Sequence, residues 1–506
     1  MSEGIPSARL LRSGALRLAF VNLNLGHFKQ GLVYKANRMW TPYSVAIMAA
    51  MQRGRGHVCR VIDANACGLS LRETVRALLE HRADIAVLVT QPTDRWQNPY
   101  PSIEGQREFS RLLRASGFTG VLVALGPQPS LLPEHYLRHI PQTDVILTGE
   151  PEPALDALVY HLQGGLPAAR VPGAMWLHQG EVVRAAPPQR VENLDALPLP
   201  AFDLLPMQNY QFHFYSRLID PQHRFAFIET TRGCPYACSF CNLSLYGTRV
   251  RRFSVQRVLR EIDLLVQKWR VNYLFFGDLT FGIHKKDTRE LLEGLVERNY
   301  PLRWSCQTRV DILDESMLAL MSRAGCHRIE AGIETAAPEL LADVKNVEIR
   351  RLREFIAMLA DFDIKLETGH MLGLPGQTAR DVIDSARFMR ALGVRFKITA
   401  VVVPYPGTRE FETGRAEGKI TAPDWPAIVR AAGKCGNTFS SLRLRWLHLR
   451  VQGMYYWHVF SRGLMRLPTS GQGGALVRGL LRLPVQPRTA LGGLKRLFED
   501  ALYGKE

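Results

Sequence analysis

Acidic residues are missing from a long C-terminal stretch of this chain. Residues 425–498 contain no Asp or Glu, and residues 441–506 hold eleven Lys or Arg against three acids. The whole chain of 506 residues carries a formal charge of +17. This imbalance indicates an anionic partner, which is nucleic acid, an anionic membrane face or an acidic cofactor. A genomic bias toward arginine is another explanation for part of the excess.

Long apolar runs and a disulfide framework are also absent. No segment reaches the ~18 uninterrupted apolar residues of a membrane span, and residues 1–9 lack the apolar core of a signal peptide. Eight cysteines in 506 residues do not suggest a disulfide scaffold. We therefore expect a reducing, cytoplasmic location. An auxiliary metal cluster is not expected, because five cysteines are scattered and form no second C-x2-C pair: Cys59, Cys67, Cys306, Cys326 and Cys435.

The other three cysteines form a metal-binding pattern. Cys234, Cys238 and Cys241 stand at the spacing C-x3-C-x2-C, directly after the apolar run 225–230. Thiolates are soft ligands that suit iron–sulfur clusters. Three ligands on a four-iron cluster leave one iron open to a substrate or cofactor. Phe240 is expected to shield the cluster from water. The alternative is three unrelated cysteines in a turn.

With its C-x3-C-x-aromatic-C motif, the stretch 230–241 resembles the radical SAM superfamily, and the resemblance extends over roughly residues 17–425. It implies a 4Fe–4S cluster whose open iron chelates S-adenosylmethionine (SAM). In that family the reduced cluster cleaves SAM to methionine and a 5′-deoxyadenosyl radical. A low-potential electron donor, flavodoxin or ferredoxin, is implied as well.

Strands and helices alternate in the first third of the chain. Helical patterns at 42–55, 71–81 and 105–116 separate strand-like apolar runs at 17–24, 57–63, 84–90, 121–126 and 144–148. This alternation predicts an α/β fold with a doubly wound, Rossmann-like parallel sheet. Ligands of such sheets bind at the carboxyl ends of the strands, which here carry Asn24, Asp63, Thr90, Gly126 and Gly149.

This region resembles the cobalamin-binding domain found ahead of many radical SAM domains. The match rests on Asp63 and on residues 84–87, 126–130 and 148–152. A D-x-H-x-x-G motif, whose histidine ligates cobalt in cobalamin mutases, is absent, so a fold retained without cobalamin stays the alternative. The family often has a histidine at the position of Gln128. The resemblance implies cobalamin contacts from Asn24, Asp63, Thr90, Gly126, Gln128, Gly149 and Glu150.

Six further strand-like runs predict a second α/β unit. They cover 225–230, 271–276, 302–309, 328–335, 366–373 and 397–403, with helices between them. Six βα units imply a partial (β/α)6 barrel with its chemistry at the carboxyl ends of the strands. The radical SAM resemblance implies cofactor contacts there from Gly277, Asp278, Arg309, Glu334 and Pro404. The alternatives are a capping role for Asp278 and a buried ion pair for Arg309 or Glu334.

These patterns divide the chain into four parts. We expect a cobalamin-binding domain at 1–165, a linker at 166–220, a radical SAM barrel at 221–425, and a basic helical extension at 426–506. The extension is rich in Leu, Trp, Tyr and Arg over 442–460. Four interpretations of this segment stay open. It lies on a membrane surface, it covers the active site, it binds nucleic acid, or it packs on the barrel with its arginines solvated.

The function predicted from these features is a cobalamin-dependent radical SAM enzyme that methylates an unactivated carbon. Relatives of the tetrapyrrole cyclase type use the same parts for ring formation, which stays an alternative. The net charge favours RNA modification, but the relatives that modify RNA carry a second cluster, for which Cys59 and Cys67 are poorly placed. A non-catalytic cobalamin or SAM sensor is a third interpretation. We expect a small-molecule or lipid-like substrate and, through the basic tail, peripheral contact with the inner membrane face.

Overall fold

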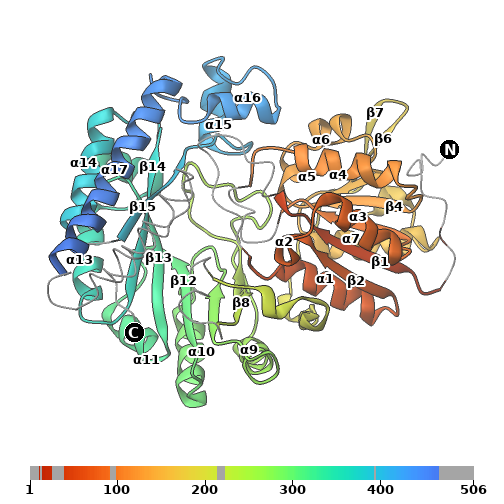
Figure 1. The fold of residues 1–506 in the computed structure, drawn as a ribbon, viewed down its shortest axis with the longest axis horizontal. Coiled ribbons are helices and arrows are strands. Elements are labelled where there is room, and N and C mark those ends of the chain that lie inside the picture. The colour runs from red at the N-terminus through yellow and green to blue at the C-terminus, as the bar shows by residue number, and fades with distance from the viewer. Residues whose placement is uncertain are drawn as a thin grey trace.

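Two α/β units make up the part of the chain that the computed structural model describes, which is residues 11, 14–25, 39–91, 99–212, 223–392 and 395–466 (Figure 1). The first unit lies to the right in Figure 1 and the second, with the C-terminal helix, to the left. The last forty residues of the predicted basic extension lie outside the described residues.

The first unit is a seven-stranded sheet with the strand order β2-β1-β3-β4-β5-β6-β7. Strands β1 to β5 pair in parallel, which confirms the doubly wound sheet. The strands are β1 (Arg17–Asn22), β2 (Val58–Asp63), β3 (Ile85–Val89), β4 (Val121–Leu125), β5 (Val145–Leu147), β6 (Ala174–His178) and β7 (Glu181–Arg184). The helices are α1 (Tyr43–Gly54), α2 (Ala64–Cys67), α3 (Leu71–Glu80), α4 (Glu104–Ala115), α5 (Pro127–Leu131), α6 (Pro133–His139) and α7 (Pro151–Leu162).

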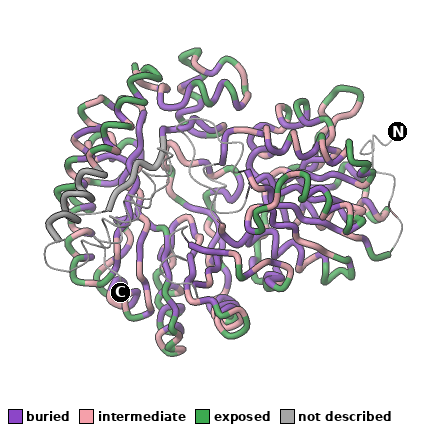
Figure 2. The backbone as a smooth tube through the Cα atoms, viewed as in Figure 1, coloured by how far each residue is buried: buried purple, intermediate pink, exposed green. Residues whose placement is uncertain are grey.

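Every residue of β3 and β4 is buried, because helices cover both faces of the sheet (Figure 2). This is why the two strands are uninterrupted apolar runs rather than alternating ones, and why they were recognisable in the sequence. The order β2-β1-β3 reverses the direction of winding between β1 and β3. The carboxyl ends of these two strands therefore form the crevice in which such sheets bind ligands.

Strands β6 and β7 are an antiparallel hairpin that the sequence analysis did not predict. They add to β5 and carry the sheet past residue 165, into the segment expected to be a linker. Their two-residue turn, Gln179 and Gly180, has positive φ at both positions, as in a type I′ hairpin turn. Strand β6 buries its first three residues, but it is only five residues long, and none of the four residues of β7 is buried, so the pair has no extended strand pattern.

The second unit is an open six-stranded parallel sheet with the order β15-β14-β13-β12-β11-β8. Because β8 and β15 stay unpaired edges among the described strands, the predicted partial barrel is confirmed. Its strands are β8 (Phe225–Ile228), β11 (Tyr273–Phe276), β12 (Arg303–Thr308), β13 (Cys326–Glu334), β14 (Lys365–Leu372) and β15 (Arg395–Val401). Its helices are α9 (Val255–Trp269), α10 (Lys285–Arg298), α11 (Glu315–Arg323), α12 (Pro338–Lys345), α13 (Ile349–Leu359), α14 (Ala379–Ala391), α15 (Arg409–Ala416), α16 (Trp425–Ala431) and α17 (Ser441–Arg466).

An aromatic cluster joins the two units. The Trp40 ring, just before α1, lies 4.6 Å from the Phe275 ring and 5.8 Å from the Phe227 ring of the barrel strands. The Trp40 indole also donates to the Phe212 carbonyl over 3.0 Å. These contacts fix the start of α1 against the barrel, so the units are packed together rather than tethered by a loose connection.

Candidate active site

The three motif cysteines lie on a loop that opens and closes with a short antiparallel ladder. Strand β9 (Thr231–Arg232) precedes the cysteines and pairs with β10 (Arg251–Arg252) after them. Gly233 has φ +94°, and a Cβ there would stand 2.2 Å from the Arg249 carbonyl oxygen, so only glycine fits. The Cys234 amide donates to the Gly247 carbonyl over 3.2 Å. The sequence R-G-C thus dictates a tight entry into the loop.

Polar side chains stand beside two of the cysteine sulfurs. The Thr280 hydroxyl lies 3.4 Å from Cys234 Sγ, and Arg309 Nη1 donates to Cys238 Sγ over 3.6 Å. Burial raises the pKa of both Cys238 and Cys241. These thiols are therefore neutral unless a bound metal holds them as thiolates, as in a metal site.

The loop fits a four-iron cluster rather than a single ion. Among the described residues, no three His, Cys, Asp or Glu side chains converge on one metal position. A four-iron cluster makes no such demand, because each thiolate binds a different iron at its own corner. Three closely spaced cysteines on one glycine-bounded loop are the donor set that such a cluster needs.

Arg309 is held rigidly at the cluster loop. Its guanidinium donates to both carboxylate oxygens of Asp311, over 2.9 and 2.8 Å, and to the Lys345 carbonyl over 3.2 Å. It also lies 3.9 Å above the centre of the Tyr236 ring, inside the cysteine motif. With its donors committed in this way, Arg309 presents a fixed positive charge to Cys238.

Glu334 and Lys345 form a neighbouring ion pair with an N–O distance of 3.3 Å. Glu334 ends β13 in the left-handed region, at φ +60°, where the register with β14 shifts. Lys345 also donates to the carbonyl of Gly332. Non-glycine residues held at positive φ cluster at functional sites, which fits the predicted role of Glu334.

Phe240 is half-buried against an apolar group below the loop. It packs on Val344, Met371, Leu374 and Val402, which come from α12, β14 and the segments that follow β14 and β15. The predicted shielding would therefore be provided by this whole group, with Phe240 as its member nearest in sequence to the cysteines.

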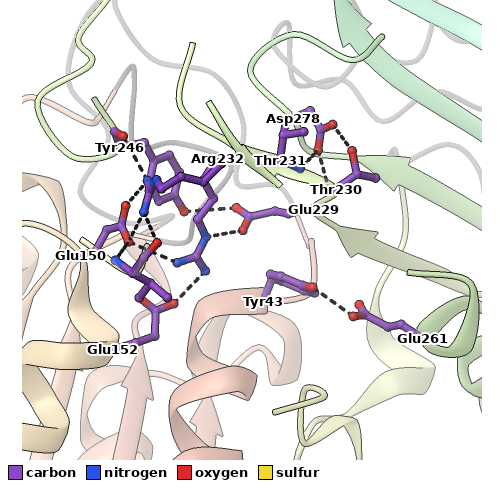
Figure 3. A network of polar contacts seen from close by, with 12 residues as sticks. Tyr43, Glu150, Glu152, Glu229, Thr230, Thr231, Arg232, Tyr246, Glu261 and Asp278 are labelled. Atoms are coloured by element: carbon purple, nitrogen blue, oxygen red, sulfur yellow. Dashed lines mark hydrogen bonds and ion pairs between the residues drawn. The ribbon is translucent and has the colours of Figure 1, made fainter. Parts of the chain in front are cut away.

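Asp278 is fully engaged by the start of the cysteine loop (Figure 3). Its carboxylate accepts from the Thr230 amide over 2.6 Å, from the Thr231 amide over 3.1 Å, and from the Thr230 hydroxyl. Burial raises the pKa of Asp278, and these hydrogen bonds lower it. The carboxylate therefore holds the strand before the cysteines and does not cap its own strand–helix turn, while a contact with SAM stays a prediction. The neighbouring Gly277 is required by packing, because a Cβ there would overlap the Phe227 ring at 1.9 Å.

A buried ionic network ties the cysteine loop to the first unit (Figure 3). Arg232, on β9 and two residues before Cys234, has a fully buried side chain. Its guanidinium donates to Glu152 of α7 over 2.7 Å and to Glu229 over 3.0 Å. Next to it, Arg251 of β10 forms an ion pair with Glu150 at the start of α7. The first unit thereby holds both strands of the ladder that carries the cysteines.

The network contains more acids than bases. Among the described residues, Glu150, Glu152 and Glu229 form ion pairs with just two guanidinium groups, those of Arg232 and Arg251. Burial raises the pKa of Glu229 to about 7, although Arg232 opposes the shift. When Glu229 is protonated, two carboxylates face two guanidinium groups and the charges of the network balance. Desolvation also favours the neutral form of Glu229, so both effects act in the same direction.

The carboxyl edge of the first sheet gathers the other predicted residues. Asp63 accepts from Asn22 over 3.0 Å and from the Tyr210 hydroxyl over 2.8 Å, so its carboxylate is bound by the protein itself. By contrast, Thr90 Oγ1 and Gln128 Oε1 are buried without a hydrogen-bond partner among the described residues. Buried polar atoms of this kind are normally satisfied. Their unmet hydrogen-bonding capacity fits a polar ligand at this edge, as predicted for cobalamin.

Three of the remaining predicted residues follow strands of the first sheet, whereas Pro404 follows β15 of the second unit. Gly126 follows β4 at φ +114°, and a Cβ there would stand 2.6 Å from the Thr90 hydroxyl oxygen, while Gly149 follows β5 at φ +80°. Asn24 follows β1. Pro404 precedes Tyr405, whose hydroxyl donates to the Pro99 carbonyl of the first unit over 2.6 Å. Glu150 differs from the others, because it lies in the ionic network between the units.

The residues that connect the two units were not predicted from the sequence. Arg232 stands inside the motif that was recognised, but nothing in the sequence indicated its partner Glu152, 80 positions earlier. Lys345 was missed as well, since a lysine at a helix end is ordinarily a solvated surface residue. Only the spatial arrangement identifies these side chains.

Comparison with known proteins identifies the class. Residues 228–389 match the model of the radical SAM superfamily, and they span the cysteine loop and most of the barrel. The match and the cysteine loop identify a radical SAM domain at these residues, and a doubly wound parallel sheet precedes this domain in the chain.

Similar proteins cover most of the chain. A methyltransferase of Pyrococcus horikoshii, itself uncharacterized, is 26% identical over 386 residues, which are 76% of this chain and 80% of that protein. The anaerobic magnesium-protoporphyrin IX monomethyl ester cyclase of Rubrivivax gelatinosus is 28% identical over 382 residues, 74% of this chain and 66% of the cyclase. The structure of the radical SAM methyltransferase TsrM of Kitasatospora setae, with cobalamin and a [4Fe-4S] cluster bound, superposes with a TM-score of 0.63 at 18% identity, covering 80% of this chain and 76% of TsrM. This last likeness establishes the fold.

Proposed function

We propose that this protein is a cobalamin-dependent radical SAM methyltransferase that acts on an unactivated carbon. The proposal rests on the buried ionic network, which holds the cysteine loop against the sheet that is predicted to bind cobalamin. A cysteine loop held by the first unit in this way supports a reaction that uses the cofactors of both units together. When bound, the cluster with SAM would supply a hydrogen-abstracting radical, and methylcobalamin would supply a methyl group that a carbon radical can accept.

The residues of this chain would have separate tasks. Cys234, Cys238 and Cys241 would hold the cluster, and Arg309 would fix a positive charge beside it. Thr90 and Gln128 would bind the corrinoid through their buried, unsatisfied oxygens. The apolar group around Phe240 would exclude water from the radical. A low-potential flavodoxin or ferredoxin would supply the electron.

Ring formation is the second candidate function. It is favoured by the similarity to a magnesium-protoporphyrin ester cyclase, which covers 74% of this chain at 28% identity. RNA modification has less support, because no second cluster motif accompanies the first. We propose a small-molecule substrate, with a lipid-like molecule as the preferred chemical class.

The test is anaerobic purification after expression with cobalamin supplied, followed by iron, sulfide and corrinoid quantification. The expected result is about four iron and about one corrinoid per chain. SAM with a deuterated methyl group then distinguishes the two functions, because only methyl transfer places the label in the modified substrate. Iron without corrinoid would contradict the proposal. As a control, Cys238→Ala should lose the cluster, whereas Cys435→Ala, which removes a buried cysteine outside the motif, should keep it.

A further inference from the structure

The described side chains of helix α17 (Ser441–Arg466) form two apolar faces, and only one of these faces packs against the described part of the chain. Leu444, Leu447 and Val451 are almost completely buried, and the helix packs there on α14 and β15. This inner face secures the helix along the outside of the barrel (Figure 1). The packing of the inner face fixes the orientation of the helix, and it therefore also fixes which residues form the outer face.

The outer face consists of Leu442, Trp446 and Leu449. Their spacing of four and three residues places them in one row, opposite the inner face. They are 78%, 45% and 66% exposed, and they are three of the seven exposed large hydrophobic residues among the described positions. A solvent-exposed row of this kind is a sign of an interaction surface, because isolated exposed apolar residues are common but clusters are not.

Arginines border the outer face on both sides. Arg443 and Arg450 lie 5.1 and 4.9 Å from the centre of the Trp446 ring, and Arg445 stands on the opposite border. No acidic residue occurs between positions 425 and 498 to neutralise them. An apolar row between cationic borders, with an amphipathic Trp, is the pattern of a helix that lies in a membrane interface.

We propose that the outer face of α17 docks on an anionic lipid surface, with Leu442, Trp446 and Leu449 entering the boundary between headgroups and acyl chains. This interaction is independent of the proposed methyl transfer. A second copy of the chain is a poorer occupant, because it would bring two sets of three uncompensated arginines together. No described helix is long and apolar enough to cross a membrane.

The test is co-sedimentation of the full-length holoprotein with two kinds of vesicle, one of phosphatidylcholine alone and one that also contains phosphatidylglycerol. The protein should sediment with the anionic vesicles, and less so as the salt concentration rises. The triple variant Leu442→Ser, Trp446→Ser, Leu449→Ser should bind them about tenfold more weakly or worse. The matched control Tyr160→Ser, which removes another exposed apolar side chain (57% exposed, on α7), should bind as the parent does.

A second measurement locates the contact. Brominated lipids should quench part of the tryptophan fluorescence of the parent, and Trp446→Phe should lose that part while still binding. Unchanged melting curves for the variants would exclude misfolding as the cause of weaker binding. The proposal is overturned if the parent stays in solution with both vesicle types. It is also overturned if the triple variant sediments as the parent does, because the binding would then belong to other basic segments. A triple variant that still binds vesicles but no longer binds RNA would assign the outer face to nucleic acid and would overturn the proposal as well.

Discussion

The guanidinium group of Arg232 donates to the carboxylate of Glu152 over 2.7 Å, and both side chains are completely buried. Arg232 stands two residues before the first motif cysteine, and Glu152 lies on a helix of the other unit. The cysteine loop is therefore held in part by the domain that is expected to carry the second cofactor. This arrangement makes the two halves of the molecule interdependent.

Breaking this pair should destabilise both units. Arg232→Met would leave Glu152 buried without its cation, and we expect a loss of about 3–5 kcal/mol together with poor retention of iron. The double variant Arg232→Met, Glu152→Gln should be less damaged than the sum of the single variants, because the unpaired charge is gone. Chemical denaturation and iron content measure both effects. Additive effects would contradict direct coupling, and Arg53→Met, which breaks an exposed ion pair with Asp203, is the control.

Glu229 should make stability depend on pH. Its pKa is about 7 in the folded protein, above the ordinary value of 4.5, because burial disfavours the carboxylate. The protonated group contributes stability that is fully present below pH ~4.5 and is lost as the pH rises through ~7. Glu229→Gln keeps the neutral form at every pH. Relative to this variant, the parent should lose on the order of 2–3 kcal/mol between pH 5 and pH 8.

Melting temperatures of parent and variant across that range give the measurement. The difference between them should be small at pH 5 and grow toward pH 8. A constant difference would show that Glu229 does not change its protonation state there. Glu354→Gln is a suitable control, since Glu354 pairs with arginines on an exposed helix surface and should show no such trend.

Asp278 should be needed for the shape of the cysteine loop. Asp278→Ala leaves the buried amides of Thr230 and Thr231 without an acceptor, at about 1–3 kcal/mol for each unsatisfied group. We expect reconstituted iron content to fall, and Thr230→Val, which removes only the hydroxyl donor, to show a milder version. The measurement is iron content beside SAM affinity. If Asp278→Ala kept all its iron and lost only SAM binding, the carboxylate would act on the cofactor instead of the loop.

Arg309 should tune the reduction potential of the bound cluster. Its guanidinium lies 3.6 Å from Cys238 Sγ and would stabilise negative charge on a reduced cluster bound there. Arg309→Met should therefore shift the midpoint potential to a more negative value in a redox titration followed by electron paramagnetic resonance. Asp311→Asn, which loosens the guanidinium without removing it, should shift the potential less. An unchanged potential in Arg309→Met would show that the group does not act on the cluster.

The sequence by itself determined the order of elements and the chemistry of the donors. Buried parallel strands such as β3 and β4 are continuous apolar runs, and the C-x3-C-x2-C spacing is local, so both were readable without a structure. The hairpin β6–β7 was missed, since β6 is only five residues long and its partner β7 has no buried residue, which leaves no repeating pattern across the pair. The buried ionic network between the two units could not be predicted from the sequence, for a stronger reason. A carboxylate at position 152 looks like any acidic residue in the first turn of a helix.

Only the tertiary structure decided which charges are buried and what they face. In the folded chain, Arg232 contacts Glu152, although the two residues are 80 positions apart in the sequence. The Asp278 carboxylate accepts hydrogen bonds from the start of the cysteine loop. Glu150, which was expected at the cofactor edge, forms an ion pair between the two units. It also placed one apolar face of α17 in the core and left the other in solvent. Local sequence specifies periodicity and ligand type, whereas burial and charge pairing are properties of distant segments that meet only when the chain folds.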